Sequence, residues 1–84
     1  MNKEDIFKII VGHICDVIPE LQSHKFDYSD KLSELGANSV DRAEIITLTI
    51  ESISLHTSLV DMAGAKNLGE LVNIFYEKLC LTKY

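Results

Sequence analysis

Hydrophobic side chains recur along residues 3 to 18 with the period of an α-helix. At about 100° per residue they fall on one broad stripe, which consists of Ile6, Phe7, Ile10, Val11, Ile14, Val17 and Ile18. Asn2 can cap the start of this helix with Asp5 at its third position, and Pro19 has no N–H with which to continue it. The pattern therefore predicts an amphipathic helix over residues 3–18 that buries one face in a core.

Residues 19 to 38 show no sustained helical or strand period. Four hydrophobic residues are spaced through this stretch as anchors that can hold a long loop on a core, namely Leu21, Phe26, Leu32 and Leu35. A structureless loop of about 20 residues is uncommon in a compact domain and tends to have a function. The end of the loop, where residues 36–39 read Gly-Ala-Asn-Ser, is therefore a candidate functional segment.

A second helical pattern follows from Val40 to about Ser54. The side expected to face the core carries Ile45, Ile46, Thr49, Ile50 and Ile53. The opposite side is acidic with small hydrophobic patches, and it carries Val40, Ala43, Glu44, Thr47 and Glu51. Because β-branched residues lower the helix propensity of this segment, the prediction depends on the period and on the start signal.

Two further helices are predicted after residue 54. Residues 55–66 form a connector with one short helical turn near Val60 to Ala63, which Gly64 ends. Asn67, with Glu70 three residues later, begins a last helix that extends to about Leu81. Its hydrophobic residues have the i, i+3, i+4, i+7, i+11 spacing of a helical face and are Leu68, Leu71, Val72, Phe75 and Leu79.

Three longer helices, one short helix and the lack of an alternating strand pattern predict an all-α fold. The expected architecture is a four-helix bundle with the long loop between its first and second helices. A chain of 84 residues can build one hydrophobic core, so residues 1–84 are expected to form a single domain. Its 46% hydrophobic and 25% charged residues are typical of a folded globular protein and exclude a disordered chain.

The negative charge of the chain is concentrated in its middle. The formal net charge is −5. Between Asp27 and Asp61 seven acids face only two bases, Lys31 and Arg42, whereas the rest of the chain has six of each. An acidic protein offers no basic face to the phosphates of nucleic acid, so nucleic acid is not an expected partner.

Membrane insertion and catalysis find little support in the sequence. No stretch approaches the roughly 20 apolar residues that span a bilayer, and the first residues lack a signal-peptide pattern, so we expect a cytoplasmic protein.

Cys15 and Cys80 have no metal-ligand spacing and are expected to be reduced packing residues. His13, His24 and His56 are scattered over a helix, a loop and a connector. No catalytic or metal-binding set is therefore predicted, and an enzyme is the weakest hypothesis.

The end of the long loop carries the motif with a defined chemistry. The segment Glu34–Asp41 reads ELGANSVD and resembles the attachment motif of acyl carrier proteins, in which Leu-Gly is followed by an Asp-Ser-Leu that opens the second helix. The order of helices and loops resembles that family along essentially the whole chain. The resemblance implies that a phosphopantetheinyl transferase attaches 4′-phosphopantetheine to Ser39, and that the thiol of this arm carries the acyl group.

The position of Ser39 favours such a modification on physical grounds as well. A serine where a loop enters a helix can present its hydroxyl to a partner enzyme, and the unpaired N–H groups of the first turn favour an added phosphate. Gly36 supplies backbone freedom for the tight entry. The alternative is that Ser39 or Asn38 serves only as a helix cap. Two positions differ from the usual motif, Asn38 in place of Asp and Val40 in place of Leu, and they suggest an adapted set of partners.

The resemblance also implies a docking surface on the outer side of the second helix. Carriers of this family present an acidic second helix to basic patches on their enzymes, and its charge steers the encounter. The residues expected on this docking surface are Val40, Asp41, Arg42, Ala43, Glu44, Thr47 and Glu51. Arg42 is unusual within an acidic face and could discriminate among partners. The alternative is an acidic, solvated face that keeps a small protein in solution.

The run GANSVDRAEI at residues 36–45 resembles stand-alone carriers of bacterial polyketide pathways, in particular the acetyl-donor carriers of β-branching cassettes. This likeness implies that the carrier is a monomer with an acyltransferase, a ketosynthase-like decarboxylase and an HMG-CoA synthase-like enzyme as partners. The last of these adds the acetyl unit to the β-carbonyl of a polyketide.

Three alternatives stay open. A carrier for fatty acid synthesis is the runner-up, although its motif more often keeps Asp-Ser-Leu. A peptidyl carrier of nonribosomal synthesis is third, because such carriers commonly read Gly-Gly-x-Ser. A hypothesis from another class is a non-catalytic adaptor bundle that binds partners through its acidic helix without a prosthetic group.

Overall fold

The computed structural model describes residues 1–55 and 64–81. Helix α1 spans Lys3–Val17, a short 3-10 helix η1 spans Pro19–Leu21, α2 spans Ser39–Ser52 and α4 spans Leu68–Leu81. No strand occurs within these two stretches, and the predicted all-α fold is confirmed. The short helix predicted near residues 60–63 lies outside the described residues.

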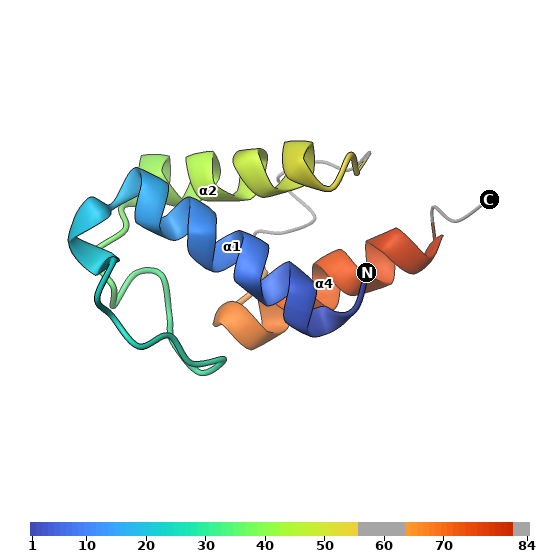
Figure 1. The fold of residues 1–84 in the computed structure, drawn as a ribbon, viewed down its shortest axis with the longest axis horizontal. Helices are drawn as coiled ribbons and strands as arrows, with labels where there is room; N and C mark the ends of the chain where they lie inside the picture. Colours follow the sequence, from blue (N-terminus) through green and yellow to red (C-terminus); the bar gives the residue numbers. More distant parts are fainter. Residues whose placement is uncertain (56–63, 82–84) are drawn as a thin grey trace.

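Helix α1 is the centre of the arrangement. It packs against α2 on one side and against α4 on the other, whereas the backbones of α2 and α4 do not come into contact along the described residues (Figure 1). The long loop crosses the end of the molecule at which α1 ends and α2 begins (Figure 1). This arrangement leaves the space between α2 and the start of α4 to be lined by side chains.

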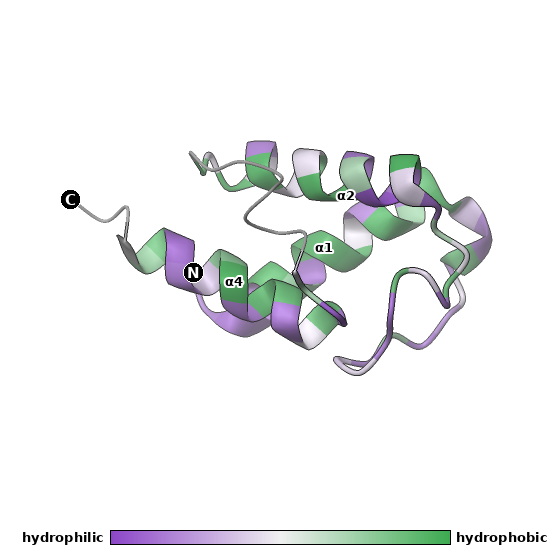
Figure 2. Ribbon diagram, turned by 180° about the vertical axis from the view of Figure 1, so that it is seen from behind, coloured by the Kyte–Doolittle hydropathy of each residue, from purple (hydrophilic) through white to green (hydrophobic). Residues whose placement is uncertain are grey.

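Most of the core comes from the hydrophobic stripes that the sequence predicts, and Leu55 of the predicted connector is buried with them. Figure 2 shows hydrophobic segments of α1 and α4 along the sides on which these helices meet. The buried core residues are Ile6, Ile10, Ile14, Ile45, Ile53, Leu55, Leu68, Leu71, Val72 and Phe75. Burying each such side chain contributes roughly 1.5–3 kcal/mol. Thr49 is also buried, and its hydroxyl donates a hydrogen bond of 2.8 Å to the carbonyl of Ile45, so its polar atom is satisfied.

The three long helices all begin with an asparagine whose side chain caps the first turn. The side chain of Asn2 accepts a hydrogen bond of 2.8 Å from the N–H of Asp5, and Asn67 accepts one of 2.8 Å from the N–H of Glu70. Both predicted caps are therefore confirmed. The third cap, Asn38 at the start of α2, lies directly before Ser39 in the candidate site.

The long loop is held on the start of α4 by backbone hydrogen bonds. The N–H of Leu68 donates to the carbonyl of Asp30 at 2.9 Å, and the N–H of Gly69 donates to the carbonyl of Tyr28 at 2.8 Å. These bonds satisfy donors that a helix start leaves without an intrahelical partner. The ring of Tyr28 also stacks on Phe7 of α1, with 4.3 Å between the ring centroids. The loop is therefore joined to both α1 and α4.

Three of the four predicted anchors of the loop have the expected position, since Leu21, Phe26 and Leu32 are partly buried against the core. Leu35 is half-buried but is not among the residues packed on the core. The two cysteines are free, as expected; Cys15 is half-buried, whereas Cys80 is exposed, so the predicted packing role is wrong for Cys80 because its face of α4 points to solvent. No helix among the described residues is long and apolar enough to cross a membrane.

Candidate functional site

The chain turns into α2 through a glycine and a buried alanine. Gly36 has φ +95°, a conformation that glycine adopts without steric cost and other residues rarely do. The next residue, Ala37, is buried, and its N–H donates a hydrogen bond of 3.0 Å to the carbonyl of Leu32. The backbone is thereby fixed on the core immediately before α2 begins, and the predicted role of Gly36 is confirmed.

Asn38 is the residue that caps α2. Its side chain accepts a hydrogen bond of 2.8 Å from the N–H of Asp41, and the carboxylate of Asp41 accepts one of 3.3 Å from the N–H of Asn38. This reciprocal pair is a capping box. Ser39 is consequently the first residue of the helix and is not its cap. Of the two residues that the sequence offered as the helix cap, Asn38 is the one that has this role.

The hydroxyl of Ser39 is left free by this arrangement. Ser39 is exposed, and within residues 1–55 and 64–81 its Oγ atom forms no hydrogen bond. The N–H groups of Ser39 and Val40 likewise have no acceptor in the described part of the chain. An exposed nucleophilic oxygen next to unpaired N–H donors at the positive end of a helix is well suited to bear a phosphate.

A cavity of about 450 Å³ opens beside Ser39, between the loop, α2 and the beginning of α4. Its lining is mainly apolar, and it includes Leu32, Ala43, Ile46, Leu68 and Leu71. Five polar residues also line it, and two of them carry a positive charge: Ser33, Ser39, Arg42, Lys66 and Asn67. Its volume is in the range of small-molecule sites.

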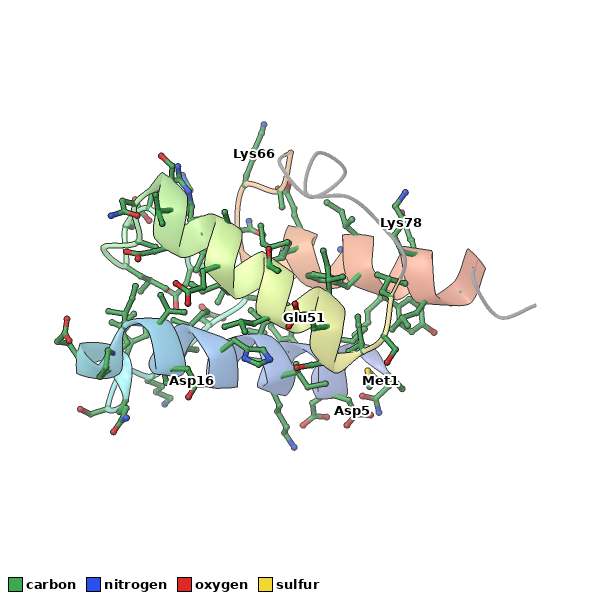
Figure 3. All side chains as sticks on the ribbon, turned by 90° about the horizontal axis from the view of Figure 1, so that it is seen from above. Met1, Asp5, Asp16, Glu51, Lys66 and Lys78 are labelled. Atoms are coloured by element: carbon green, nitrogen blue, oxygen red, sulfur yellow. The ribbon has the colours of Figure 1, made fainter. Side chains whose placement is uncertain are left out.

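The residues predicted for the docking surface divide into two groups. Val40, Glu44, Thr47 and Glu51 are exposed, and Val40 is 73% exposed despite its apolar side chain. Figure 3 shows Glu51 on α2. The other three are half-buried, namely Asp41, Arg42 and Ala43. Asp41 is engaged in the cap of α2, and Arg42 and Ala43 line the cavity, so these side chains have roles besides any docking.

Two of the three histidines have hydrogen-bond partners among the described residues. His13 forms a hydrogen bond with Ser52, and His24 forms one with Asp30. A backbone N–H of Asp27 and the imidazole of His24 hold the pKa of Asp30 below its ordinary value, because both stabilise the carboxylate. The part of the chain that the structure describes contains no group of three potential metal ligands, and His56 lies outside it.

The sequence did not indicate the cavity or the part that Lys66 has in it. Lys66 precedes the last helix in a segment without helical period, and nothing in its neighbours marks it as lying near Ser39. The cavity arises from the way in which the loop, α2 and α4 approach one another, so only the spatial arrangement brings Arg42 and Lys66 to the same space.

The fold and this site define a class of protein: a small helical bundle that presents a free serine at the first turn of an acidic helix. The chain is 48% identical over 79 residues to the polyketide biosynthesis acyl carrier protein AcpK of Bacillus subtilis (strain 168), which covers 94% of this chain and 96% of that protein. No family model matches the chain.

A solved structure gives the same result. A chain in the crystal structure of the curacin biosynthetic pathway HMG synthase in complex with acetyl donor acyl carrier protein is similar, with a TM-score of 0.86 and 43% identity, over 89% of this chain and 96% of that one. The chain thus belongs to the acyl carrier protein family. The predicted family, the fold and the assignment as a carrier and not an enzyme are confirmed by this membership.

Proposed function

We propose that this protein carries acyl groups as thioesters on a 4′-phosphopantetheine arm attached to Ser39. The observation that supports this most directly is the free, exposed hydroxyl of Ser39 at the first turn of α2, beside a cap made by Asn38. When bound, the arm supplies the thiol to which an acyl group is joined. The chain contributes the attachment oxygen and the surface that partner enzymes recognise.

The residues around Ser39 fit a phosphodiester. The unpaired N–H groups of Ser39 and Val40 point toward the helix start, where the helix dipole favours negative charge. Asn38 provides the cap without the negative charge of the usual aspartate. The phosphodiester therefore meets one carboxylate fewer in this first turn than in carriers with the common motif.

The acyl group that we assign is acetyl, and the process is β-branching in polyketide biosynthesis. Both relatives support this, since one is named for polyketide biosynthesis and the other is an acetyl donor in complex with an HMG synthase. The partners are then a phosphopantetheinyl transferase, an acyltransferase, a ketosynthase-like decarboxylase and an HMG-CoA synthase-like enzyme. A cytoplasmic, monomeric, single-domain protein is consistent with this function.

The outer side of α2 is the surface that we assign to docking. Val40, Glu44, Thr47 and Glu51 are exposed along it, and an exposed apolar residue beside the attachment serine suits a hydrophobic contact with an enzyme. Asp41, Arg42 and Ala43 complete the set at its inner edge. The acidic charge steers the encounter with basic patches on the enzymes.

Mass spectrometry tests the attachment. The unmodified protein is incubated with coenzyme A and a broad-specificity phosphopantetheinyl transferase, and the wild type is expected to gain one phosphopantetheine. Ser39→Ala is expected to gain none, and Ser33→Ala, another exposed serine on the cavity, serves as the control that gains one. A wild type that stays unmodified, or a Ser39→Ala protein that is still modified, would favour the adaptor hypothesis instead.

The assignment to β-branching needs a second assay. The acetylated protein is offered separately to an HMG synthase-like enzyme and to a ketosynthase of fatty acid synthesis, and loss of acetyl from the carrier is followed by intact mass. We expect the first enzyme to accept the acetyl group with the higher kcat/KM. A higher kcat/KM with the fatty acid enzyme would support the runner-up function.

A further inference from the structure

Two cationic residues, Arg42 and Lys66, line the cavity beside Ser39, and the proposed function gives neither of them a role toward the arm itself. Arg42 follows Ser39 by three positions on α2, which places both side chains on the same face of the helix. Lys66 belongs to the segment leading into α4 and lines the same cavity. Figure 3 shows the side chain of Lys66 extending outward from this segment, and Lys66 is exposed, so its long side chain is free to turn toward a group on Ser39.

Arg42 occurs where the chain is otherwise acidic. The residues from Asp27 to Asp61 carry seven acids and only two bases, of which Arg42 is one. Among the described residues, neither Arg42 nor Lys66 forms an ion pair with a carboxylate. Their positive charges are therefore available to another anion at this place.

We propose that Arg42 and Lys66 form a cationic clamp for the phosphodiester of the arm on Ser39, and that this clamp holds the arm along the cavity. The proposal rests on the proposed function, because the phosphodiester exists only when Ser39 is modified. The phosphorus is joined directly to the Ser39 oxygen, so the anion has to lie within reach of a side chain three positions along the helix. Arginine and lysine are the residues that bind phosphate oxygens most strongly.

The chemistry of the cavity beyond the clamp matches the remainder of the arm. Leu32, Ile46 and Leu71 make an apolar wall, which suits the dimethyl group of pantetheine and the methyl group of a short acyl chain. A clamped phosphodiester directs the arm toward this wall. The arm then has two populations, one held against the carrier and one extended to an enzyme, and the charge of Arg42 and Lys66 sets their ratio.

Each cation is expected to stabilise the held arm by the modest amount that is usual for an ion pair partly exposed to solvent. Removing one of them should lower the ratio of held to extended arm by about two- to fivefold, and salt should lower it in the wild type as well. Removing both should bring the arm close to the fully extended population. The backbone of Ser39 and the cap of α2 are not affected by these changes.

The experiment uses a pantetheine analogue that ends in an environment-sensitive fluorophore, transferred enzymatically onto Ser39. Arg42→Gln, Lys66→Gln and the double variant are compared with the wild type and with Lys25→Gln, which removes an exposed positive charge outside the cavity lining. Transfer is verified by intact mass and folding by circular dichroism, so that each loaded protein is known to be intact before emission is measured.

The wild type and Lys25→Gln are expected to show blue-shifted emission, which the Arg42 and Lys66 variants and added NaCl shift toward that of the probe in water. Equal emission for all five proteins, whether blue-shifted or water-like, would overturn the clamp. Failure of the probe to attach to Ser39 of the wild type would instead overturn the proposed function, so the two failures are distinguishable.

Discussion

His13 on α1 and Ser52 at the end of α2 are joined by a hydrogen bond of 2.6 Å between the imidazole Nε2 and the hydroxyl Oγ. It connects side chains of two helices that otherwise meet through hydrophobic contacts. A serine hydroxyl can donate or accept, so the bond forms with either tautomer of the ring. The second ring nitrogen of His13 is buried and lies 3.6 Å from the carboxylate of Asp16.

This bond is expected to stabilise the packing of α1 on α2. His13→Ala and Ser52→Ala should each lower the free energy of unfolding by about 0.5–1.5 kcal/mol, the range for one hydrogen bond. Urea denaturation of the single and double variants gives the coupling energy between them. Asp16→Asn is the control, because its carboxylate is 74% exposed and should contribute little. Additive effects of the two alanine substitutions would show that the bond does not contribute.

The cap of α2 gives a second prediction. Asn38→Ala should lower the free energy of unfolding by about 1 kcal/mol, because it removes the acceptor for the N–H of Asp41. Asn38→Asp keeps an acceptor there and should retain the stability. Asn73→Ala, at an exposed position within α4, is the matched control and should be neutral or stabilising. Thermal or urea denaturation measures all three; an unchanged stability of Asn38→Ala would contradict the assigned cap.

The sequence contained the evidence for this cap, although it left Asn38 and Ser39 as alternatives. A capping box needs an acid three positions after the cap, and Asp41 has that spacing from Asn38 and not from Ser39. The helices were predictable for a similar reason, since hydrophobic period and caps are local signals. The boundaries of the three long helices are consequently within two residues of those expected.

The contacts between distant segments could not be predicted in this way. The bonds from Leu68 to Asp30 and from Gly69 to Tyr28 join backbone groups, and backbone groups are the same in every residue. The cavity beside Ser39 depends on these contacts, because they set where the loop and the start of α4 lie. Arg42 was therefore assigned from sequence to the docking surface alone, and its place in the cavity required the structure.

The close approach of the loop to α4 predicts different effects for two helical glycines. A Cβ atom on Gly69 would lie 3.3 Å from the carbonyl oxygen of Tyr28, whereas one on Gly12 would meet nothing within 4 Å. Gly12→Ala should raise the free energy of unfolding by about 0.5–1 kcal/mol, the usual gain for replacing a helical glycine. Gly69→Ala should lack this gain because the loop has to move. Equal stabilisation by both, measured by urea denaturation, would contradict the tight contact.

The carboxylate of Asp30 predicts an acid dependence of stability. The N–H of Asp27 and the ring of His24 keep its pKa below the ordinary value of 3.8, so the folded state binds a proton less readily than the unfolded state. Its contribution to stability is thus present above pH 3.8 and is lost as the pH falls through the lowered pKa. Asp30→Asn should remove this loss, leaving a smaller difference in stability between neutral and acidic solution.

The measurement for Asp30 is urea denaturation of wild type and Asp30→Asn over a series of pH values. Asp5→Asn is the comparison, because Asp5 also accepts a backbone hydrogen bond, in the cap of α1. It shows how the acid dependence of stability changes when a carboxylate elsewhere in the chain is removed. If Asp30→Asn keeps the full acid dependence of the wild type, the destabilisation in acid comes from other carboxylates.

The docking surface gives the last prediction. Glu44 and Glu51 are exposed on α2, so reversing either to Lys should leave the fold intact and slow transfer of the acyl group to a partner enzyme. The expected loss in kcat/KM at low salt is on the order of tenfold, since charges of this kind mainly steer association. Salt should shrink the difference by screening exposed charges.

The same charge reversal at Glu77 is the matched control, because it is exposed on α4 and outside the docking surface. Steady-state transfer rates of the four proteins at low and high salt are compared after each is loaded with the same acyl group. Glu77→Lys is expected to behave as wild type. If all three reversals slow transfer equally, the effect comes from net charge and not from a surface on α2; if none does, Glu44 and Glu51 lie outside the interface.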